Sequence, residues 1–437
     1  MNKASRILLG IGFLALLLVS WIVAANSKSS KQKQSELLTE ANELISDEIY
    51  IRALPLLEEA AGYKAAYTLE AETRLKDVYI ELMGQSGIKN KYINLLEKQM
   101  GRDGVASDIY IEAANFYLDT NKLQEALTVL KSGISKLGDQ TLVDFYEANR
   151  YAFKINRSTY DDVSSIANGL IQVSNDGLWG LANSDGTLII SCEYDKLSSY
   201  SNSRSIALKG GIVYAVDLRN NRLFLLYDTA TDLKNYGDDR IGVLLKDGWH
   251  RANGELVVGS MAFEDIGMYS GGFVAAKQNG KWGVVDIGSE WLVPAEWEGI
   301  IQDDLGRCYA QGAVFAINNG KAVLIVNGTD TGKEFEDARP FVDGGWAAVK
   351  EGGKWGFIDT TGTFQIAPQF DDALSFSGHL AAVKQGDLWG YLSLTGKMAI
   401  EPQFKLAKSF LDGNAPVLTD NGYQFISLTE YKKDEGF

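Results

Sequence analysis

A glycine-rich stretch near the C-terminal end of the chain has the residue types of a phosphate-binding loop. The segment EGGKWGFIDTTG, at residues 351–362, places glycines, a lysine, an aspartate and two threonines around Trp355. A phosphate loop needs the spacing G-x-x-x-x-G-K-[ST], which this segment lacks. The segment NGTDTGKE, at residues 327–334, comes nearer, but Glu334 stands where Ser or Thr is needed. The spacing therefore argues against a nucleotide site.

Acidic residues recur beside an aromatic residue throughout the C-terminal half. A glycosidase needs one pair of carboxylates, one of them with a raised pKa, whereas pairs that recur copy after copy indicate a repeat consensus. Two interpretations stay open: solvent-facing positions without a ligand, or a negative belt that attracts a basic partner or cations. The residues of this expected acidic belt are Glu193, Asp195, Glu296, Glu298, Asp371 and Asp372.

The chain has few of the side chains that support metal binding or thiol chemistry. It contains two His and two Cys, and the cysteines do not form a C-x-x-C pair. We therefore expect no metal site, no cofactor and no catalytic residue. Cys192 and Cys308 are expected to be small core residues, and a disulfide between them stays open if the chain is exported.

The residues discussed so far belong to a unit that repeats from residue 169 onward. Trp-Gly pairs mark four clear copies, and Trp249, Tyr214, Ala322 and Tyr423 fill the tryptophan slot in degenerate copies. The slots recur about every 34 residues, with one longer interval of 40 between positions 282 and 322. The clear pairs are Trp179-Gly180, Trp282-Gly283, Trp355-Gly356 and Trp389-Gly390.

Each slot of the repeat has a physical role. A strand of small residues and the Trp-Gly strand are joined by a short Gly- and Asn-rich turn, which predicts a tight hairpin. The tryptophan buries a large apolar area, and the glycine after it leaves room for a neighbouring backbone or ring. Prolines follow 12 or 13 residues later, where a strand at an edge tolerates a missing N–H. These prolines are Pro294, Pro368 and Pro402.

This pattern is similar to that of the WG-repeat, or KWG-repeat, family of bacterial β proteins, over about 60% of the chain. A hairpin with one further strand cannot bury its own face, so copies must stack. The resemblance implies an all-β, β-propeller-like ring with 7–8 small blades, counted as seven full repeats and a final hairpin at 415–428. An open β-solenoid is the alternative.

The segment before it, residues 35–155, has helical periodicity and resembles tetratricopeptide-like helical hairpins. In residues 107–139 the aromatic slots hold Tyr110 and Tyr117, and the small slots hold Ala114 and Gly133. Residues 37–64 fit the same frame, and the section between them is more degenerate. A generic all-α bundle is the alternative, and neither suggests catalysis.

The first 34 residues are expected to be a membrane anchor and a basic linker. Residues 7–25 form an uncharged apolar run of 19 residues, which as a helix spans about 28 Å, close to the thickness of a bilayer core. A cleaved signal peptide is the alternative. We expect a single-pass transmembrane helix in the cell membrane with the bulk of the chain on the extracellular side.

The sequence thus predicts a multidomain protein with a linker at 156–168, a WG-repeat β domain at 169–428 and a polar tail at 429–437. The net charge of −15 argues against nucleic acid as a partner. By resemblance, both repeat types imply a non-catalytic scaffold of the bacterial cell envelope that binds protein partners. A cell-wall or polysaccharide binder is the alternative, and an envelope hydrolase is a remote one.

Overall fold

The computed structural model describes residues 30–198, 204–217, 222–227, 229–237, 240–252, 257–286, 288–342, 345–377 and 379–429. The chain divides into two compact units between Asn149 and Arg150, and each unit is described by itself. The expected membrane helix at 7–25 lies outside the described residues, as does all but the first residue of the expected tail at 429–437. Within the described ranges, no helix is both long and apolar enough to span a membrane.

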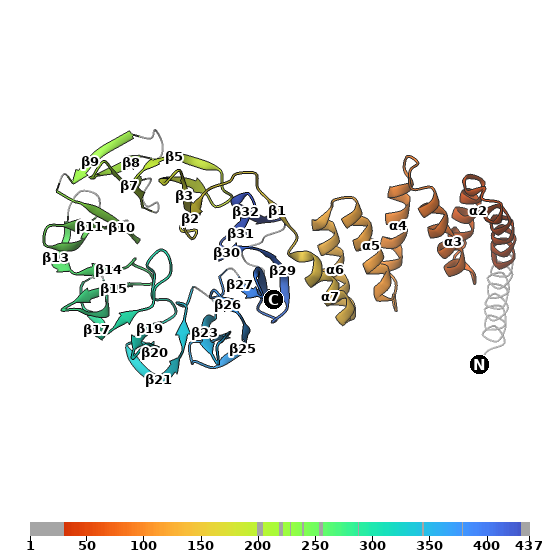
Figure 1. Ribbon diagram of the computed structural model, residues 1–437. Coiled ribbons are helices and arrows are strands. Elements are labelled where there is room, and N and C mark those ends of the chain that lie inside the picture. The colour runs from red at the N-terminus through yellow and green to blue at the C-terminus, as the bar shows by residue number, and fades with distance from the viewer. Residues whose placement is uncertain are drawn as a thin grey trace, which may run out of the picture. The chain divides into compact units, whose positions relative to one another are not determined.

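The first unit is all-helical, as its periodicity predicted (Figure 1). Consecutive helices pack as antiparallel neighbours because the connections between them are short. Residues 30–46 are helical, and the helices that follow are α2 (Tyr50–Gly62), α3 (Thr68–Glu81), α4 (Ile88–Met100), α5 (Ser107–Asp119), α6 (Leu123–Leu137) and α7 (Gln140–Arg150).

Small residues let the helices of a hairpin approach each other, as the sequence predicted. A Cβ on Gly133 would lie 2.8 Å from the ring of Tyr110 and 2.9 Å from Leu142, so α6 must carry glycine where α5 and α7 meet it. Ala114 and Ala126 are fully buried between α5 and α6. The helical hairpins are therefore confirmed for residues 107–137.

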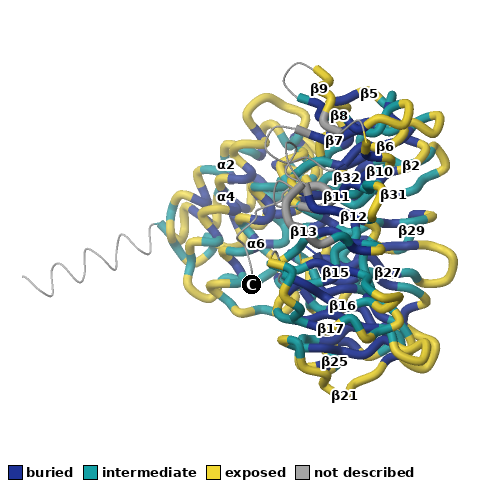
Figure 2. The backbone as a smooth tube through the Cα atoms, turned by 90° about the vertical axis from the view of Figure 1, so that its left-hand side faces the viewer, coloured by how far each residue is buried: buried dark blue, intermediate teal, exposed yellow. Residues whose placement is uncertain are grey.

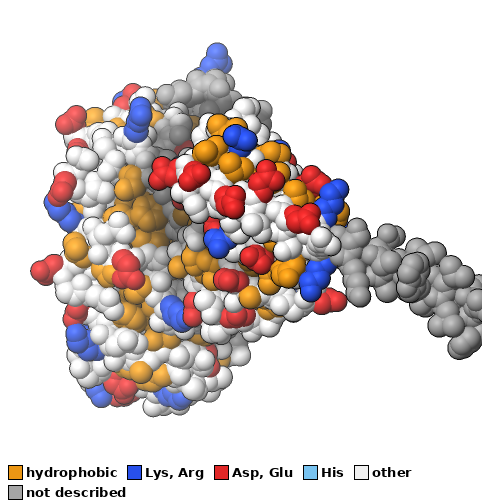
Figure 3. Space-filling model, turned by 90° about the vertical axis from the view of Figure 1, so that its right-hand side faces the viewer, with side chains coloured by type: hydrophobic (Ala, Val, Ile, Leu, Met, Phe, Trp, Pro, Cys, Tyr) orange, Lys and Arg blue, Asp and Glu red, His pale blue; other side chains and the backbone are white. Residues whose placement is uncertain are grey.

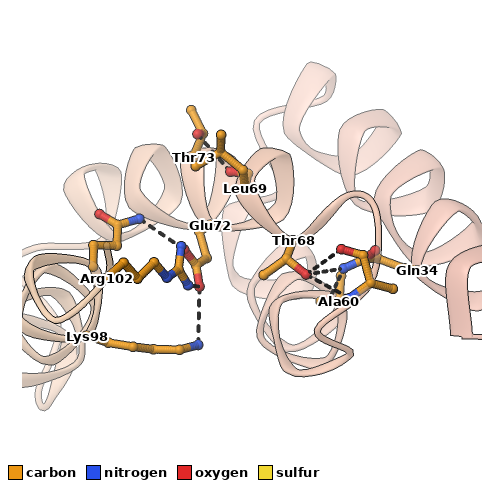
Figure 4. Close-up of polar contacts among 10 residues, drawn as sticks. Gln34, Ala60, Thr68, Leu69, Glu72, Thr73, Lys98 and Arg102 are labelled. Atoms are coloured by element: carbon orange, nitrogen blue, oxygen red, sulfur yellow. Dashed lines mark hydrogen bonds and ion pairs between the residues drawn. The ribbon is translucent and has the colours of Figure 1, made fainter. Parts of the chain in front are cut away.

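The degenerate middle of the helical unit contains buried polar groups (Figure 4) beside an apolar cluster that includes Leu75, Val78 and Leu96. The Glu72 side chain, on α3, is fully buried and meets Lys98 and Gln99 of α4, each at 3.2 Å, and Arg102. Burial alone would raise the pKa of Glu72, but the hydrogen bonds from Arg102, Gln99 and Lys98 lower it. Gln34 is also buried and donates to the Ala60 carbonyl at 2.9 Å.

The second unit is a ring of eight four-stranded antiparallel sheets, or blades, each shown as a group of arrows in Figure 1. The strands of blades 1 to 4 are β2 (Asp162–Val163), β3 (Leu170–Asn175), β4 (Leu178–Asn183), β5 (Leu188–Tyr194), β6 (Lys196–Leu197), β7 (Arg204–Lys209), β8 (Ile212–Asp217), β9 (Arg222–Tyr227), β10 (Asp232–Gly237), β11 (Arg240–Leu245), β12 (Gly248–Ala252), β13 (Val257–Phe263), β14 (Asp265–Ile266), β15 (Phe273–Gln278), β16 (Lys281–Asp286) and β17 (Trp291–Trp297). The strands of blades 5 to 8 are β18 (Gly299–Ile300), β19 (Ala313–Asn318), β20 (Lys321–Val326), β21 (Thr329–Phe335), β22 (Asp337–Ala338), β23 (Ala347–Glu351), β24 (Lys354–Ile358), β25 (Phe364–Phe370), β26 (Asp372–Ala373), β27 (Leu380–Gln385), β28 (Leu388–Ser393), β29 (Met398–Phe404), β30 (Leu406–Ala407), β31 (Asn414–Thr419), β32 (Gly422–Leu428) and, from the other end of the unit, β1 (Phe153–Ile155).

The eighth blade corrects the predicted domain boundaries. The hairpin at 415–428 is completed by β1, which the sequence assigned to the helical domain and which pairs with β32 through Phe153 and Leu428. The expected linker at 156–168 contains β2 and Tyr160, whose backbone bonds that of Tyr423. The sequence could not show this because β1 and its partner lie at opposite ends of the unit. The ring is closed, so the propeller is confirmed over the solenoid.

Each of the eight interfaces between neighbouring blades holds its own apolar cluster. Figure 2 shows buried residues following the strands, with exposed ones gathered in the turns. At the closing interface, Phe425 of blade 8 packs edge-on against Tyr160, with ring centroids 6.0 Å apart. Because each blade buries its two faces against its neighbours, the closed ring removes the solenoid's exposed terminal faces.

Candidate functional site

The Trp-Gly pair marks a local irregularity in each of the four blades that contain it, blades 1, 4, 6 and 7. In blade 6, Trp355 is opposite Phe370 and Phe357 is opposite Ile366, so three residues of β25 face Gly356 alone. A Cβ on Gly356 would lie 2.7 Å from the Ile366 carbonyl oxygen and 2.7 Å from the nitrogen of Pro368. Glycine is required because the bulged outer strand approaches its backbone, as the sequence predicted. Pro368 sits in the middle of the bulge, where the ladder is interrupted.

The other clear copies repeat this geometry, with Trp179, Trp282 and Trp389 opposite an aromatic residue of the outer strand. Gly180, Gly283 and Gly390 each leave 2.4 Å between a virtual Cβ and a carbonyl oxygen of that strand. The prolines Pro294 and Pro402 lie in the corresponding bulges.

Degenerate copies show what happens without the glycine. In blade 5, Val323 takes its place and pairs directly with Glu334, and the bulge moves one residue along the strand. In blade 2, Ala215 pairs directly with Phe224. In blade 3, Trp249 keeps its slot opposite Phe263 and is buried. The tryptophans of the repeat thus have a packing role, as the sequence predicted, because they lie against aromatic residues of the outer strands.

Two of the six acids of the expected belt, Asp195 and Asp371, serve hairpin turns. Asp195 accepts the backbone N–H of Gly210 at 2.8 Å, and Asp371 accepts that of Gly386 at the same distance. The turn residues have positive φ, and their N–H groups point at the carboxylate. The same contact recurs in other blades through Asp161, Glu264 and Glu336.

The remaining members of the expected acidic belt lie apart from one another. Glu193 pairs with Lys209 at 2.9 Å, whereas Glu296 and Glu298 are exposed on and beside the outer strand of blade 4. Asp372 alone begins an innermost short strand. The structure therefore distributes these six carboxylates over turns, outer strands and the ring centre, and their role as a binding belt stays a prediction.

Three ion pairs between neighbouring blades, which were not predicted from the sequence, lie near the innermost strands of the ring. In each pair, a cation on one blade meets the aspartate that begins the innermost strand of the next blade. Lys196 lies 2.7 Å from Asp232, and Arg339 lies 3.4 Å from Asp372. Lys234 likewise pairs with Asp265. Lys234 and Arg339 also cover the tryptophan rings of Trp249 and Trp355, at 4.7 and 4.4 Å from the ring centroids.

Five aspartates that begin the innermost strands of their blades share one further role. Each accepts the backbone N–H of the residue that follows it at 2.8 Å, and this hydrogen bond orients the carboxylate. They are Asp162, Asp232, Asp265, Asp337 and Asp372.

The loop after β18 breaks the symmetry of the ring. Asp303 ties it into a turn, because its carboxylate accepts the Leu305 N–H at 3.0 Å and binds the Arg307 backbone and side chain at 2.8 and 2.6 Å. Gly306 accepts the Met268 N–H at 2.7 Å. A Cβ on Gly267 would lie 2.5 Å from the Gly306 carbonyl oxygen, so blade 4 and the loop touch through their backbones.

The tip of this loop reaches across the ring to blade 8. The Asp304 carboxylate lies 2.6 Å from the Lys408 ammonium, and Leu305 packs with Ala167 of blade 1 and Met268. Burial alone would raise the pKa of Asp304, but Lys408, with a hydrogen bond from Ser165, prevails and lowers it. The loop therefore braces blades 1, 4 and 8 around the channel.

Two cavities lie against this brace and share Gln302, Asp303, Asp304 and Lys408. The larger, of about 560 Å³, is lined by the innermost strands of blades 1 to 4, with Leu197, Leu233 and Ile266 beside Lys196 and Lys234. The other, of about 430 Å³, faces blades 6 to 8 and is lined by Arg339, Trp389 and Tyr423. The residues that line these cavities were not identified from the sequence. The sequence contains one indication of them, the interval of 40 residues between the slots at 282 and 322, because this interval includes the additional loop.

Metal and thiol chemistry have no site among the described residues. No group of three or more His, Cys, Asp or Glu side chains there could hold a metal. Cys192 and Cys308 are both free thiols, so the disulfide left open by the sequence is not formed. Burial raises the pKa of the Cys308 thiol to about 12, which makes it an inert core residue.

The strand order and the braced channel define the class of this protein: an eight-bladed β-propeller that follows a helical-hairpin unit in the sequence. Its repeat is the WG-containing repeat, matched at residues 158–179, 179–211, 252–282, 333–355, 355–389 and 389–423. The chain is therefore a WG-repeat β protein. The unmatched stretches hold the degenerate slots Tyr214, Trp249 and Ala322.

No curated protein matches the chain. Among solved structures, Hsv2 of Kluyvelomyces marxianus is 9% identical with a TM-score of 0.37, covering 56% of this chain and 96% of its own. The structure of YCF48 bound to a D1 peptide is 12% identical with a TM-score of 0.35, covering 62% and 100%. The propeller is defined by the strand order of this chain itself.

Proposed function

We propose that this chain is a non-catalytic scaffold that binds protein partners, with the propeller channel as its principal binding site. The observation that carries the proposal is the braced channel mouth. Its charges are held in place by ion pairs between blades, and apolar side chains lie between them. Because the side chains of such a surface are already ordered, the entropic cost of ordering them when a partner binds is small.

The electrostatics of the channel favour binding over acid catalysis. A general acid at neutral pH needs a carboxyl with a raised pKa, and the pKa of Asp304 is instead lowered by Lys408. Figure 3 shows a face away from the channel mouth, on which acidic and basic side chains are also interspersed. Such a surface suits a protein partner with both charges better than a polyanion.

The polymer-binding alternative lacks the feature that would favour it. Exposed Trp and Tyr on one face would provide platforms for sugars, but none of the Trp side chains that the structure describes is exposed. Protein binding is therefore the function we propose.

The test is affinity capture from envelope extracts with the full chain. We expect proteins retained by the wild type to be lost from the double variant Lys196→Gln and Lys234→Gln, which neutralises two channel cations. The control, Lys209→Gln with Lys321→Gln, removes the same charge from two ion pairs outside both cavities, with Glu193 and Glu334 at 2.9 and 2.8 Å. If both variants retain the partner proteins equally, the channel is not the binding site.

We further propose that residues 7–25 anchor the chain in the bacterial cell membrane with both repeat units on the extracellular side. The uncharged apolar run supports this. Cell fractionation of the full chain and of a chain that begins at residue 30 tests the anchor, and protease treatment of whole cells tests the sidedness. Recovery of the full chain without membranes, or protection from protease in intact cells, would contradict the respective part.

A further inference from the structure

Blade 1 exposes two successive apolar side chains on its outer strand β5, Leu188 and Ile189, and the outer edge of blade 2 exposes three. Strand β9 of blade 2 carries Leu223, Phe224 and Leu225 in succession, and these side chains are 40%, 47% and 60% exposed. Successive residues of a strand point to opposite faces. Apolar side chains are therefore exposed on both faces of this edge.

Other outer strands carry devices that prevent pairing with another chain. Proline interrupts β17, β25 and β29, a bulge lies opposite the Trp-Gly pair in each of these, and β21 is charged through Asp330, Lys333 and Glu334. Prolines, charges and bulges of this kind protect natural edge strands. In blade 8 the edge strand β1 is only three residues long and includes Lys154.

Strand β9 lacks these devices along its middle. It pairs regularly with β8 from Arg222 to Leu225, and its register shift comes after that segment. No proline occurs in RLFLLY, and Arg222 at the beginning is its one charge. Among the residues that the structure describes, β9 has one sheet neighbour, β8, so its other side presents backbone N–H and C=O groups.

We propose that β9 pairs with β9 of a second copy of this chain, antiparallel and about a two-fold axis. The edge requires an extended segment that is uncharged and apolar on both faces, and β9 itself has this composition. An antiparallel pair centred within the regular segment does not place Arg222 opposite itself, so no like charges meet. A lipid surface fits less well because hydrocarbon cannot bond the edge's N–H and C=O groups.

The charge of the chain limits the strength of this pairing. Two copies with a net charge of −15 repel each other, whereas the segment from Leu223 to Leu225 is neutral and Arg222 attracts an acidic copy. A six-residue strand also buries less than the roughly 1,200–2,000 Å² of a stable interface. The expected dimer is therefore weak and concentration-dependent, and high salt strengthens it by screening the repulsion.

Analytical ultracentrifugation of the full chain in detergent tests the proposal. We expect a monomer–dimer equilibrium for the wild type that is weakened at least tenfold by Phe224→Lys and by Leu225→Lys. Leu388→Lys is the matched control, because Leu388 is an exposed apolar residue, 39% accessible, on blade 7. Circular dichroism verifies that the variants remain folded, as the exposure of these side chains predicts.

A second measurement identifies the edge directly. In a Cys192→Ser background, Phe224→Cys is expected to give a disulfide-linked dimer on mild oxidation, and Leu388→Cys is not. A wild type that stays monomeric over the whole concentration range would overturn the proposal. So would a dimer that both lysine variants retain, because dimerisation would then arise from another part of the chain.

Discussion

Asp304 and Lys408 lie 104 positions apart in the sequence, and their charged atoms approach to 2.6 Å across the channel of the propeller. The lysine side chain is 16% exposed and the aspartate side chain 36% exposed. The pair joins an inserted loop of blade 5 to blade 8. The loop is absent from the other repeats, and the pair depends on the closed ring.

Replacement of Lys408 by Met should destabilise the β unit. The change leaves the Asp304 carboxylate partly buried without its cation, at a cost of about 1–3 kcal/mol in the free energy of unfolding. Denaturant unfolding followed by tryptophan fluorescence measures the change. Lys405→Met is the control, because Lys405 pairs with Asp420 at the same 2.6 Å but in the open, and no measurable loss is expected there. Equal stability of the two variants would contradict the brace.

The same pair predicts how stability depends on pH. The pKa of Asp304 is lowered in the folded chain, so its contribution is complete above the pKa of the unfolded chain, near 4, and is lost as the pH falls through the folded value. The difference in unfolding free energy between wild type and Asp304→Asn should be constant from about pH 7 to pH 5 and should shrink below about pH 4. A difference that grows on acidification would reverse the assigned sign.

Glu72 should control the stability of the helical unit. Glu72→Gln removes the charge that Lys98 and Arg102 bind on a fully buried side chain, at a cost of about 1–3 kcal/mol. Thermal unfolding followed by far-ultraviolet circular dichroism measures the helical transition. Glu70→Gln, on the exposed side of the same helix, should leave it unchanged. If the two variants behave alike, the buried network does not stabilise this unit.

Gly356→Ala should be far more costly than an ordinary Gly-to-Ala change. The new Cβ would meet backbone atoms of β25 at 2.7 Å, so the bulge must shift, at a cost of about 1–3 kcal/mol. Gly84→Ala is the control, because no atom lies within 4 Å of its Cβ position and φ is not positive there. Unfolding by denaturant compares the two. An unaltered midpoint for Gly356→Ala would show that the bulge can move freely, as it has in blade 5.

The local parts of the fold could be predicted because each depends on neighbours in the sequence. Gly356 and Trp355 had the roles expected of them, and Asp359 with Gly362 forms the turn after them, with a 2.9 Å bond from the glycine N–H. The acids beside the aromatic residues were recognised as a consensus. Their acceptance of turn N–H groups was not, because hydrogen-bond direction depends on how the hairpin folds back.

The sequence by itself determined the repeat, its hairpins and the helical hairpins before it, because periodicity and turn residues act over a few positions. The tertiary structure decided what depends on closure of the ring. It completed blade 8 with Phe153–Ile155, brought Asp304 to Lys408 and placed Lys196 and Arg339 on the next blade's aspartates. These contacts join residues that only the geometry of the closed ring brings together, so no local pattern records them.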